Sequence, residues 1–519
     1  MLTEKRDLRT GVPLWLASGA PRLAPLRKGA SPRPDVVVVG TGISGALVAD
    51  ALLNAGYSVL AADRRKPMSG STPASTALLQ SELDTPLLEL TQKLGATTAA
   101  RVWWRSAQAV QALCDRIADL RIECDFPPRT TLYLPGNVLD ASALKVETLA
   151  HQKLGLRSVH IGREELRFMS GINKPGAILY EGNAEADPLK LVAGLWRNFL
   201  KNGGRLANDV EVTEVDSSRG AVSLATKSGA TITAKHAVFC TGYELMKFAR
   251  PRGYKVISTW VLATKQQPKN LWPSKSLIWE AADPYLYMRT TADGRIIAGG
   301  EDEPFSDDAK RDALIPEKIA TIARKAKKLM PHADFTAEYA WAGSFGDSPT
   351  GIPAIGPVKR LPGCYAVLGF GGNGITFSMP PARMDTNSDT RPASEPGLED
   401  AVLRLVRRSM QWAEAEFVLA RAEAGGILRR FAAAVGVAML AVCLTLVALV
   451  ILAQAAVAAL GEILAGPVYA GLAVGLALLV TVILLAFLAR RLLSAPAKQS
   501  ASPVLRWMTG ATAHGKETP

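Results

Sequence analysis

Three glycines near the start of the chain have the spacing of a dinucleotide-binding loop. Gly40, Gly42 and Gly45 form the pattern G-x-G-x-x-G. In such a loop the first glycine permits a tight turn, the second lets a pyrophosphate approach the backbone, and the third lets the following helix pack closely on the strand. Asp63 follows Gly45 by 18 residues, where a carboxylate can accept hydrogen bonds from a ribose. These residues predict binding of a dinucleotide, either FAD or NAD.

The elements that must position this loop form a βαβ unit. Residues 35–39 are a short run rich in valine, which is typical of a strand buried on both faces. Residues 46–54 have a helical pattern, and residues 57–62 have the pattern of a second strand. Strand, helix and strand in this order imply a parallel sheet, so we expect an α/β fold with a Rossmann-like domain.

Four segments of the chain carry a resemblance to a known family. They are VVVVGTGISGALVADALLNAGYSVLAADRR (36–65), GSTPASTALLQ (70–80), AVFCTGYE (237–244), and WAGSFGDSPTGIPAIGP with GCYAVLGFGGNGITFSM (341–357 and 363–379). In this order they resemble the FAD-dependent oxidoreductases of the D-amino acid oxidase family, which includes glycine oxidase and sarcosine oxidase. The resemblance implies FAD as cofactor, and oxidation of an amine or amino-acid-like substrate by hydride transfer to the flavin.

The resemblance also implies which residues meet the cofactor. The early glycines would cradle the pyrophosphate, a run of Ser and Thr would line the path to the isoalloxazine, and Val212 would pack near the adenine. The late glycine cluster would bring backbone N–H groups to the ring, where they stabilise negative charge on reduced flavin. The implied FAD-binding residues are Gly40, Gly42, Ile43, Ser44, Gly45, Asp63, Arg64, Ser71, Thr72, Ser75, Thr76, Val212, Gly242, Gly371, Gly372, Asn373, Gly374 and Ile375.

Substrate-binding residues are expected on a strand of a second domain. Tyr287 and Arg289 lie on this strand, and a guanidinium suits a substrate carboxylate, although a solvated strand arginine is the alternative. Members similar to glycine oxidase have an arginine after the W-A-G segment, where this chain has Phe345, which leaves room for an amine other than a simple α-amino acid. His332 and Asp347 are further polar candidates, with a surface histidine and a turn aspartate as alternatives.

The apolar excess of the chain is concentrated near its C-terminus. The 519 residues have a mean hydropathy of +0.12, yet residues 431–489 contain one charged residue, Glu462. The uncharged runs 431–461 and 463–489 both exceed the roughly 20 residues that span a bilayer core. Arginines flank the pair on both sides, so the positive-inside rule predicts two spans in the inner membrane, with both termini and the FAD domain in the cytoplasm.

These patterns predict the order of domains. Residues 1–34 would form a basic arm rich in Pro and Gly, with Trp15 as a docking point. An oxidoreductase region would follow at 35–379, with an α+β substrate domain on an antiparallel sheet. Its FAD-binding parts would lie at about 35–85, 185–250 and 345–379, its substrate-domain parts at about 86–184 and 251–344, and after it a linker (380–397), an amphipathic helix (398–428), an all-α transmembrane hairpin (431–489) and a polar tail (490–519).

The junction between the two halves suggests a fusion. Pro380 and Pro381 must stop the last helix of the FAD domain, because proline lacks the N–H and clashes with the preceding turn. From Met384 onward the chain resembles the holin-like two-span membrane proteins. The leading hypothesis is a membrane-tethered FAD-dependent oxidoreductase with oxygen or a quinone as electron acceptor. The alternatives are a non-enzymatic holin-like protein that carries a flavoprotein remnant, and a nicotinamide-dependent dehydrogenase.

Charge and cysteine content argue against other classes of protein. The net charge of +13 is spread over the arm, the domain and the tail, with no dense basic run that has interleaved aromatics, so we expect no nucleic-acid binding. The five cysteines include no CxxC pair, which predicts neither a metal site nor a disulfide framework. The N-terminus lacks the uninterrupted apolar stretch of a signal peptide.

Overall fold

The computed structural model divides the chain into two compact units, residues 1–423 and 424–519. The described residues are 2–21, 23, 33–218, 220–250, 253–368, 370–379 and a few positions between 450 and 476. The predicted linker, amphipathic helix and polar tail lie outside them, as does nearly all of the predicted hairpin at 431–489. Within the described residues, no helix combines the length and the apolar character that a membrane span requires.

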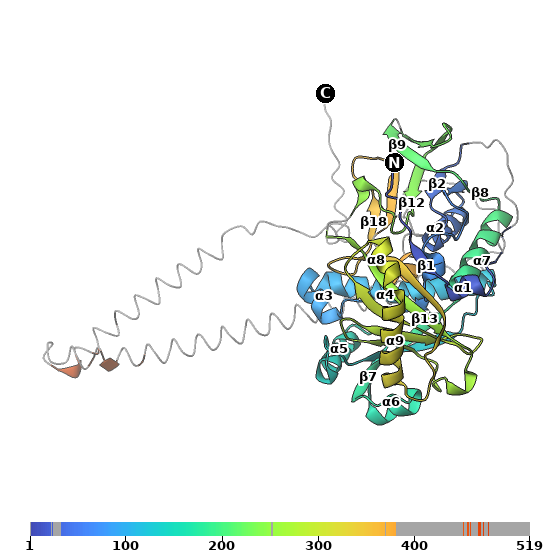
Figure 1. Cartoon of the computed structure of the whole chain (residues 1–519). Coiled ribbons are helices and arrows are strands. Elements are labelled where there is room, and N and C mark those ends of the chain that lie inside the picture. The colour runs from blue at the N-terminus through green and yellow to red at the C-terminus, as the bar shows by residue number, and fades with distance from the viewer. Residues whose placement is uncertain are drawn as a thin grey trace, which may run out of the picture. The chain divides into compact units, whose positions relative to one another are not determined.

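A six-stranded sheet forms the centre of the domain that carries the glycine loop (Figure 1). Its strands, in spatial order, are β18 (Ala354–Pro357), β19 (Cys364–Leu368), β12 (His236–Phe239), β2 (Val36–Val39), β3 (Val59–Ala62) and β8 (Arg205–Ala207). All neighbouring pairs are parallel except β18 with β19. The four valines of β2 are buried, so the run of β-branched residues is indeed a strand covered on both faces. The predicted parallel βαβ unit is confirmed.

Two helices pack together beside this sheet: α2 (Ile43–Asn54) and α7 (Pro188–Lys201). Helix α2 begins three residues earlier than predicted, because the extended backbone of Gly42 is its N-cap and the rest of the glycine loop is already helical. Trp196 and Phe199 of α7 are fully buried and make an edge-to-face contact with centroids 5.2 Å apart. Because α2 packs against α7, helix α7 holds α2, whose N-terminus follows the glycine loop, in place.

The second domain is built on a ten-stranded sheet that is mostly antiparallel, as predicted. Its spatial order is β1-β17-β13-β16-β15-β14-β5-β7-β4, and β6 also pairs with β7. The strands are β1 (Arg9–Gly11), β4 (Leu78–Leu79), β5 (Pro128–Leu134), β6 (Ser158–Gly162), β7 (Gly176–Glu185), β13 (Lys255–Thr264), β14 (Leu277–Glu280), β15 (Leu286–Thr290), β16 (Ile296–Glu303) and β17 (Ala337–Asp347). The pair β5 and β14 is parallel.

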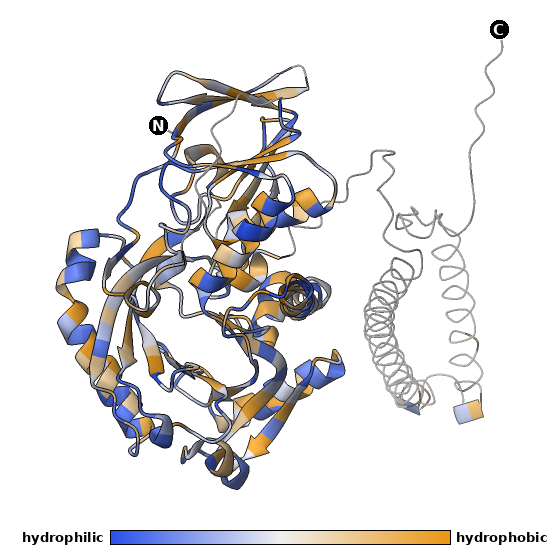
Figure 2. Ribbon diagram, turned by 90° about the vertical axis from the view of Figure 1, so that its right-hand side faces the viewer, coloured by the Kyte–Doolittle hydropathy of each residue, from blue (hydrophilic) through white to orange (hydrophobic). Residues whose placement is uncertain are grey.

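Helices cover this sheet and give it a second core. They are α3 (Leu87–Leu94), α4 (Ala96–Leu120), α5 (Ala141–Lys153), α6 (Arg163–Ser170), α8 (Asp308–Ala313) and α9 (Ile315–Leu329). Helix α9 packs on β13, β16 and β17 with Ile322 and Ala326 fully buried, and Figure 2 shows both apolar and hydrophilic residues on the outer helices. The helical pattern predicted at 87–125 is two helices, because Gly95 breaks the run with a φ of 81°.

Smaller elements complete the described chain. A three-stranded sheet consists of β9 (Val212–Ser218), β10 (Ala221–Thr226) and β11 (Thr231–Ala234). Short helices are α1 (Leu14–Ala17), η1 (Thr72–Ala74), η2 (Lys247–Ala249), η3 (Pro268–Asn270) and α10 (Gly374–Phe377). Helix α10 ends ahead of Pro380, in agreement with the stop that the prolines predict.

The N-terminal segment packs on the body of the molecule. Strand β1 pairs with β17, with Thr10 opposite Ala342. Trp15 is buried, and its indole N–H donates to the carbonyl of Ser75 at 2.8 Å. Trp15 is therefore a docking point, as predicted, and the residue that it meets lies in the Ser/Thr-rich segment after β3.

Candidate active site

Two adjoining cavities run along the predicted cofactor residues. The first contains about 800 Å³ of empty space, counted to its open mouth, and the second about 1220 Å³. Both are lined by the start of α2 and by the Ser/Thr-rich segment, so they form one elongated site. The lining residues that the two cavities share are Ile43, Ser44, Ser71, Thr72 and Gly242.

The structure brings the predicted cofactor residues together along this joined cavity. The first cavity holds those from the glycine loop, the end of β3 and the start of β9, including Asp63, Arg64 and Val212. The second holds Ser75, Thr76 and the late glycine cluster 371–375. Of the predicted cofactor residues, Gly45 is the one that does not line it.

The glycine loop is shaped for close approach of a ligand. Gly40 has a φ of 110°, and a Cβ there would lie 2.2 Å from the carbonyl oxygen of Cys240. A Cβ on Gly45 would lie 1.9 Å from the carbonyl oxygen of Gly40, so Gly45 acts beneath the loop, by packing. The backbone at Gly42 borders the cavity at the start of α2, where N–H groups attract an anion. This cradle fits the pyrophosphate of FAD.

The carboxylate of Asp63 is fixed at the end of β3 and keeps room for one more donor. Its Oδ2 accepts from the backbone N–H of Thr41 at 2.7 Å and from the Thr41 hydroxyl at 2.9 Å. Its Oδ1 accepts from the backbone N–H of Arg65 at 2.9 Å. Because a carboxylate offers about four acceptor sites, these three bonds leave capacity for a ribose hydroxyl.

At the other end, residues 80–84 hold the late glycine cluster. The N–H of Gly372 donates to Oδ2 of Asp84 at 2.9 Å, and the Asn373 amide donates to the carbonyl of Glu82. A Cβ on Gly371 or Gly372 would come within 2.9 Å of the Asp84 carboxylate. Sequence reasoning missed Asp84, and no motif in the sequence identifies it, because the loop that it meets lies 288 residues away.

The second cavity widens among aromatic side chains. Tyr287, a predicted substrate-binding residue, lines it from β15, Trp279 is its partner on β14, and Tyr285 lines it from just before β15. Phe345 also lines it, from the strand that carries the W-A-G segment. Asp84 supplies the one charged side chain in this lining, and no Lys, Arg or His of the described residues contributes to it.

Asp84 and Asp302, at this end of the site, have raised pKa values because the surrounding protein disfavours their charged forms. Asp84 is exposed within the cavity while protein surrounds it on its other sides, and this desolvation raises its pKa. For Asp302, desolvation raises the pKa to about 7, although hydrogen bonds with Tyr285 and Thr259 act in the opposite direction. Since Tyr285 and Thr259 line the cavity, Asp302 lies directly behind its wall.

Arg289 does not occupy the position that a substrate carboxylate requires. Its side chain is buried, and Nη1 donates to the carbonyls of Thr76, Ala77 and Ala186 at 2.9–3.0 Å. Its Nε lies 3.5 Å from a carboxylate oxygen of Glu185. The guanidinium therefore holds the backbone beside the cavity and does not line it, which corrects the expected role. His332 and Asp347 do not line the joined cavity either.

Within the residues that the structure describes, no group of three or more His, Cys, Asp or Glu side chains could hold a metal ion. The polar groups of the site are instead those suited to hold an organic cofactor and a small substrate.

Comparison with known proteins agrees with this geometry. The family model described as FAD dependent oxidoreductase (DAO) matches residues 35–384. The gamma-glutamylputrescine oxidoreductase of Escherichia coli K12 is 24% identical over 358 residues, which cover 66% of this chain and 80% of that protein. A probable oxidoreductase, OrdL, of Rhizobium meliloti is 24% identical over 363 residues, 67% of this chain and 81% of that protein.

Solved structures show the same fold. Glycine oxidase from Geobacillus kaustophilus superposes with a TM-score of 0.55 at 19% identity, covering 70% of this chain and all of that one. L-proline dehydrogenase from P. horikoshii gives 0.56 at 19% identity, covering 67% and 91%. With the glycine cradle, the joined cavity and a family match over most of its length, the chain belongs to the DAO family of FAD-dependent oxidoreductases and is a FAD-binding enzyme.

Proposed function

We propose that this enzyme oxidises a cationic amine without a neighbouring carboxylate, and that the substrate lies in the second cavity. The observation that carries the proposal is the charge of the cavity wall: one carboxylate, Asp84, and no basic side chain among the described residues. When bound, FAD supplies the acceptor for a hydride from the carbon next to nitrogen, and the resulting imine is hydrolysed to a carbonyl. The chain's own residues must select and orient the amine.

Asp84 is suited to hold the ammonium group. One of its oxygens accepts from the N–H of Gly372, and a carboxylate can accept about four hydrogen bonds, so capacity remains for the substrate. At 4 Å and an effective dielectric constant of 20, opposite unit charges attract by about 4 kcal/mol. An α-carboxylate on the substrate would be repelled by a similar amount, which favours amines over amino acids.

The aromatic wall supports the same class of substrate. The rings of Tyr285 and Tyr287 have centroids 5.9 Å apart, and Trp279 stacks on Tyr133 with centroids 4.1 Å apart. A cation near the face of such rings gains about 0.5–2 kcal/mol, and the rings also pack on an alkyl chain. These contacts suit an alkylamine better than a small polar amino acid.

The relatives support an amine or an amino acid as substrate. One is named for γ-glutamylputrescine, whereas two structural neighbours are named for glycine and proline. The absence of a basic side chain from the described lining is the reason to prefer the amine.

A matched pair of compounds tests the proposal. Putrescine and ornithine have the same carbon chain and terminal amines, and ornithine adds an α-carboxylate. We expect putrescine to be oxidised with the higher kcat/KM, measured as aldehyde and ammonia release by the purified holoenzyme. Equal or better oxidation of ornithine would refute the proposal. Inactivity toward both compounds would also refute it, and the chain would then be a FAD enzyme that acts on another class of substrate.

We propose in addition that the enzyme is tethered to the cytoplasmic membrane, with both termini and the FAD domain in the cytoplasm. The support is in the sequence: two long uncharged runs with arginines on both outer sides. Such a tether would bring the flavin near membrane quinones, so that a quinone as well as oxygen is a candidate electron acceptor. Carbonate extraction of membranes should leave the full-length chain in the pellet, whereas release into the supernatant would contradict the tether.

A nonenzymatic remnant is less well supported. The glycine loop, the Asp63 carboxylate and the late glycine cluster all line one intact cavity. Stoichiometric, tightly bound FAD in the purified chain would distinguish a FAD-dependent enzyme from a nonenzymatic remnant.

A further inference from the structure

The first residues of the chain lie against the cofactor cavity, although the family match begins only at residue 35. Leu2, Thr3 and Leu8 line the first cavity together with the ribose-binding candidate Asp63 and the adenine-side Val212. We refer to residues 2–11 as the N-terminal strap. The strap lies outside residues 35–384, which the family model matches.

The strap is tied to the FAD-binding domain through an ion pair. Glu244 is buried, and both its oxygens accept from the guanidinium of Arg65 at 2.7 Å. The backbone N–H of Arg6 donates to the same carboxylate at 2.9 Å, and the Arg6 carbonyl accepts from Arg65 at 3.3 Å. Both backbone groups of one strap residue are therefore bound by a charged pair at the cavity edge.

Further contacts hold the strap along the cavity. The hydroxyl of Thr3 accepts from Arg64 at 3.1 Å, and Thr3 forms an isolated antiparallel bridge with Met246. Arg9 donates to the carbonyl of Gly70, the residue before the Ser/Thr-rich lining. These contacts hold residues 2–9 along one side of the first cavity.

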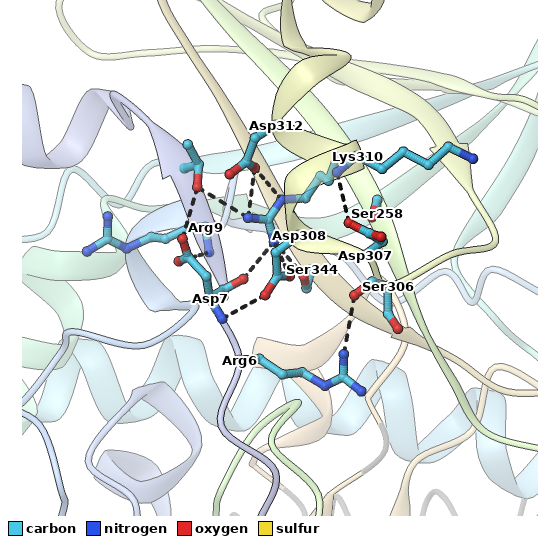
Figure 3. A network of polar contacts seen from close by, with 12 residues as sticks. Arg6, Asp7, Arg9, Ser258, Ser306, Asp307, Asp308, Lys310, Asp312 and Ser344 are labelled. Carbon is cyan, nitrogen blue, oxygen red and sulfur yellow. Dashed lines mark hydrogen bonds and ion pairs between the residues drawn. The ribbon is translucent and has the colours of Figure 1, made fainter.

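The strap is also anchored to the substrate domain (Figure 3). Arg311 of α8 is fully buried, and its Nη1 donates to the carbonyl of Asp7 at 2.7 Å and to the hydroxyl of Ser344 at 2.8 Å. The backbone N–H of Asp7 donates to Asp308 at 3.0 Å, as Figure 3 shows. With the pairing of β1 and β17, the strap bridges both domains beside the cavity.

We propose that the N-terminal strap is a third part of the FAD site, which encloses the adenosine end of the cofactor and slows its release. FAD then leaves only after residues 2–8 detach from Glu244 and Arg65. The contacts that must break are several hydrogen bonds in a partly buried setting and the burial of Leu2 and Leu8.

A reversible cross-link tests this proposal within one protein. Thr3 and Met246 are bridge partners, so the variant T3C/M246C places two cysteines at a spacing that a disulfide can join. FAD release from the full-length holoenzyme is followed by the rise in free-flavin fluorescence after dilution. We expect slower release from the oxidised form than from the same protein after reduction. Equal rates in the two forms would overturn the proposal.

A truncation supplies the second measurement. A variant that lacks residues 2–8 is expected to release FAD about tenfold faster or more, since about 1.4 kcal/mol of lost contacts already gives that ratio. The matched control is Arg324→Ala, an exposed arginine of α9 whose one hydrogen bond within the described residues is to Thr321 on its own helix. A truncated protein that folds and releases FAD at the rate of the full chain would also overturn the proposal. Should it not fold, the cross-link experiment decides alone.

Discussion

The two ends of the joined cavity are built in different ways. At the dinucleotide end the backbone forms the site: Gly40 and Gly45 have no room for a side chain, and α2 begins at the cavity. At the substrate end, side chains from strands and loops far apart in the sequence form the wall, with Asp84 facing a loop 288 residues away. This difference indicates that the cofactor is recognised by a local motif, whereas the substrate is recognised by a surface that exists only after folding.

The largest effect is expected where a buried charge supports the substrate end. Arg289→Ala removes the donor for three backbone carbonyls, while Glu185 keeps its ion pair with Arg129. A buried acceptor that loses its donor costs about 1–3 kcal/mol, so with three carbonyls affected the free energy of unfolding should fall by about 3 kcal/mol or more. Urea unfolding measures it. If stability is unchanged and only the KM for a carboxylate-bearing substrate rises, Arg289 binds substrate after all.

At the dinucleotide end, we expect steric overlap from an added side chain to weaken FAD binding. Gly45→Ala places a Cβ 1.9 Å from the carbonyl oxygen of Gly40, and such overpacking costs about 3 kcal/mol. We expect weaker FAD binding by isothermal titration, because the loop must move. Gly162→Ala is the matched control, since a Cβ there meets nothing within 4 Å. Unchanged FAD affinity in Gly45→Ala would show that the cradle tolerates a side chain.

Asp84→Asn separates the two ends most cleanly. Asn keeps an oxygen for the N–H of Gly372 but removes the charge that would hold an ammonium group. A hydrogen bond to a charged group is worth about 1.5–3 kcal/mol, so kcat/KM for the amine should fall about tenfold to a hundredfold. FAD affinity should stay the same, as a reconstitution titration would show. A parallel loss of FAD affinity would assign Asp84 to the cofactor.

The last prediction concerns Asp302 and the change in stability per unit of pH. Its carboxyl is protonated in the folded protein up to a pKa of about 7, whereas in the unfolded chain it ionises near its ordinary value. The unfolded state therefore binds fewer protons between about pH 4 and 7, and this carboxyl lowers stability as pH rises, by up to roughly 1.4 kcal/mol per unit. In Asp302→Asn the slope should be less negative over this range. Identical slopes, from unfolding curves at several pH values, would contradict the buried neutral carboxyl.

The contrast between the ends also explains what the sequence could predict. The βαβ unit, the antiparallel second domain and the docking of Trp15 were predictable, because each depends on local pattern or on a single large apolar residue. The break of the 87–125 helix at Gly95 was not, since a glycine within an apolar periodicity has more than one conformation available. Arg289 shows the limit of sequence analysis at the site. The sequence pattern of a strand arginine is the same whether its side chain faces a cavity or a cluster of carbonyls.

The N-terminal strap shows the same limit of sequence analysis. The strap belongs to residues 1–34, whose basic, Pro- and Gly-rich composition predicts an extended arm, and composition does not say what an arm lies against. Its partners Glu244, Arg311 and Ser344 lie far along the chain, so only the fold brings them to residues 6, 7 and 8.

The measurement that tests the central claim most directly is the anaerobic reduction of the bound flavin in the purified full-length enzyme. Putrescine or ornithine is mixed with the holoenzyme, and the loss of the visible flavin absorbance is followed in time. Our account predicts rapid bleaching by putrescine, much slower bleaching by ornithine, and loss of the putrescine reaction in Asp84→Asn with FAD still bound. Faster bleaching by ornithine than by putrescine would contradict it.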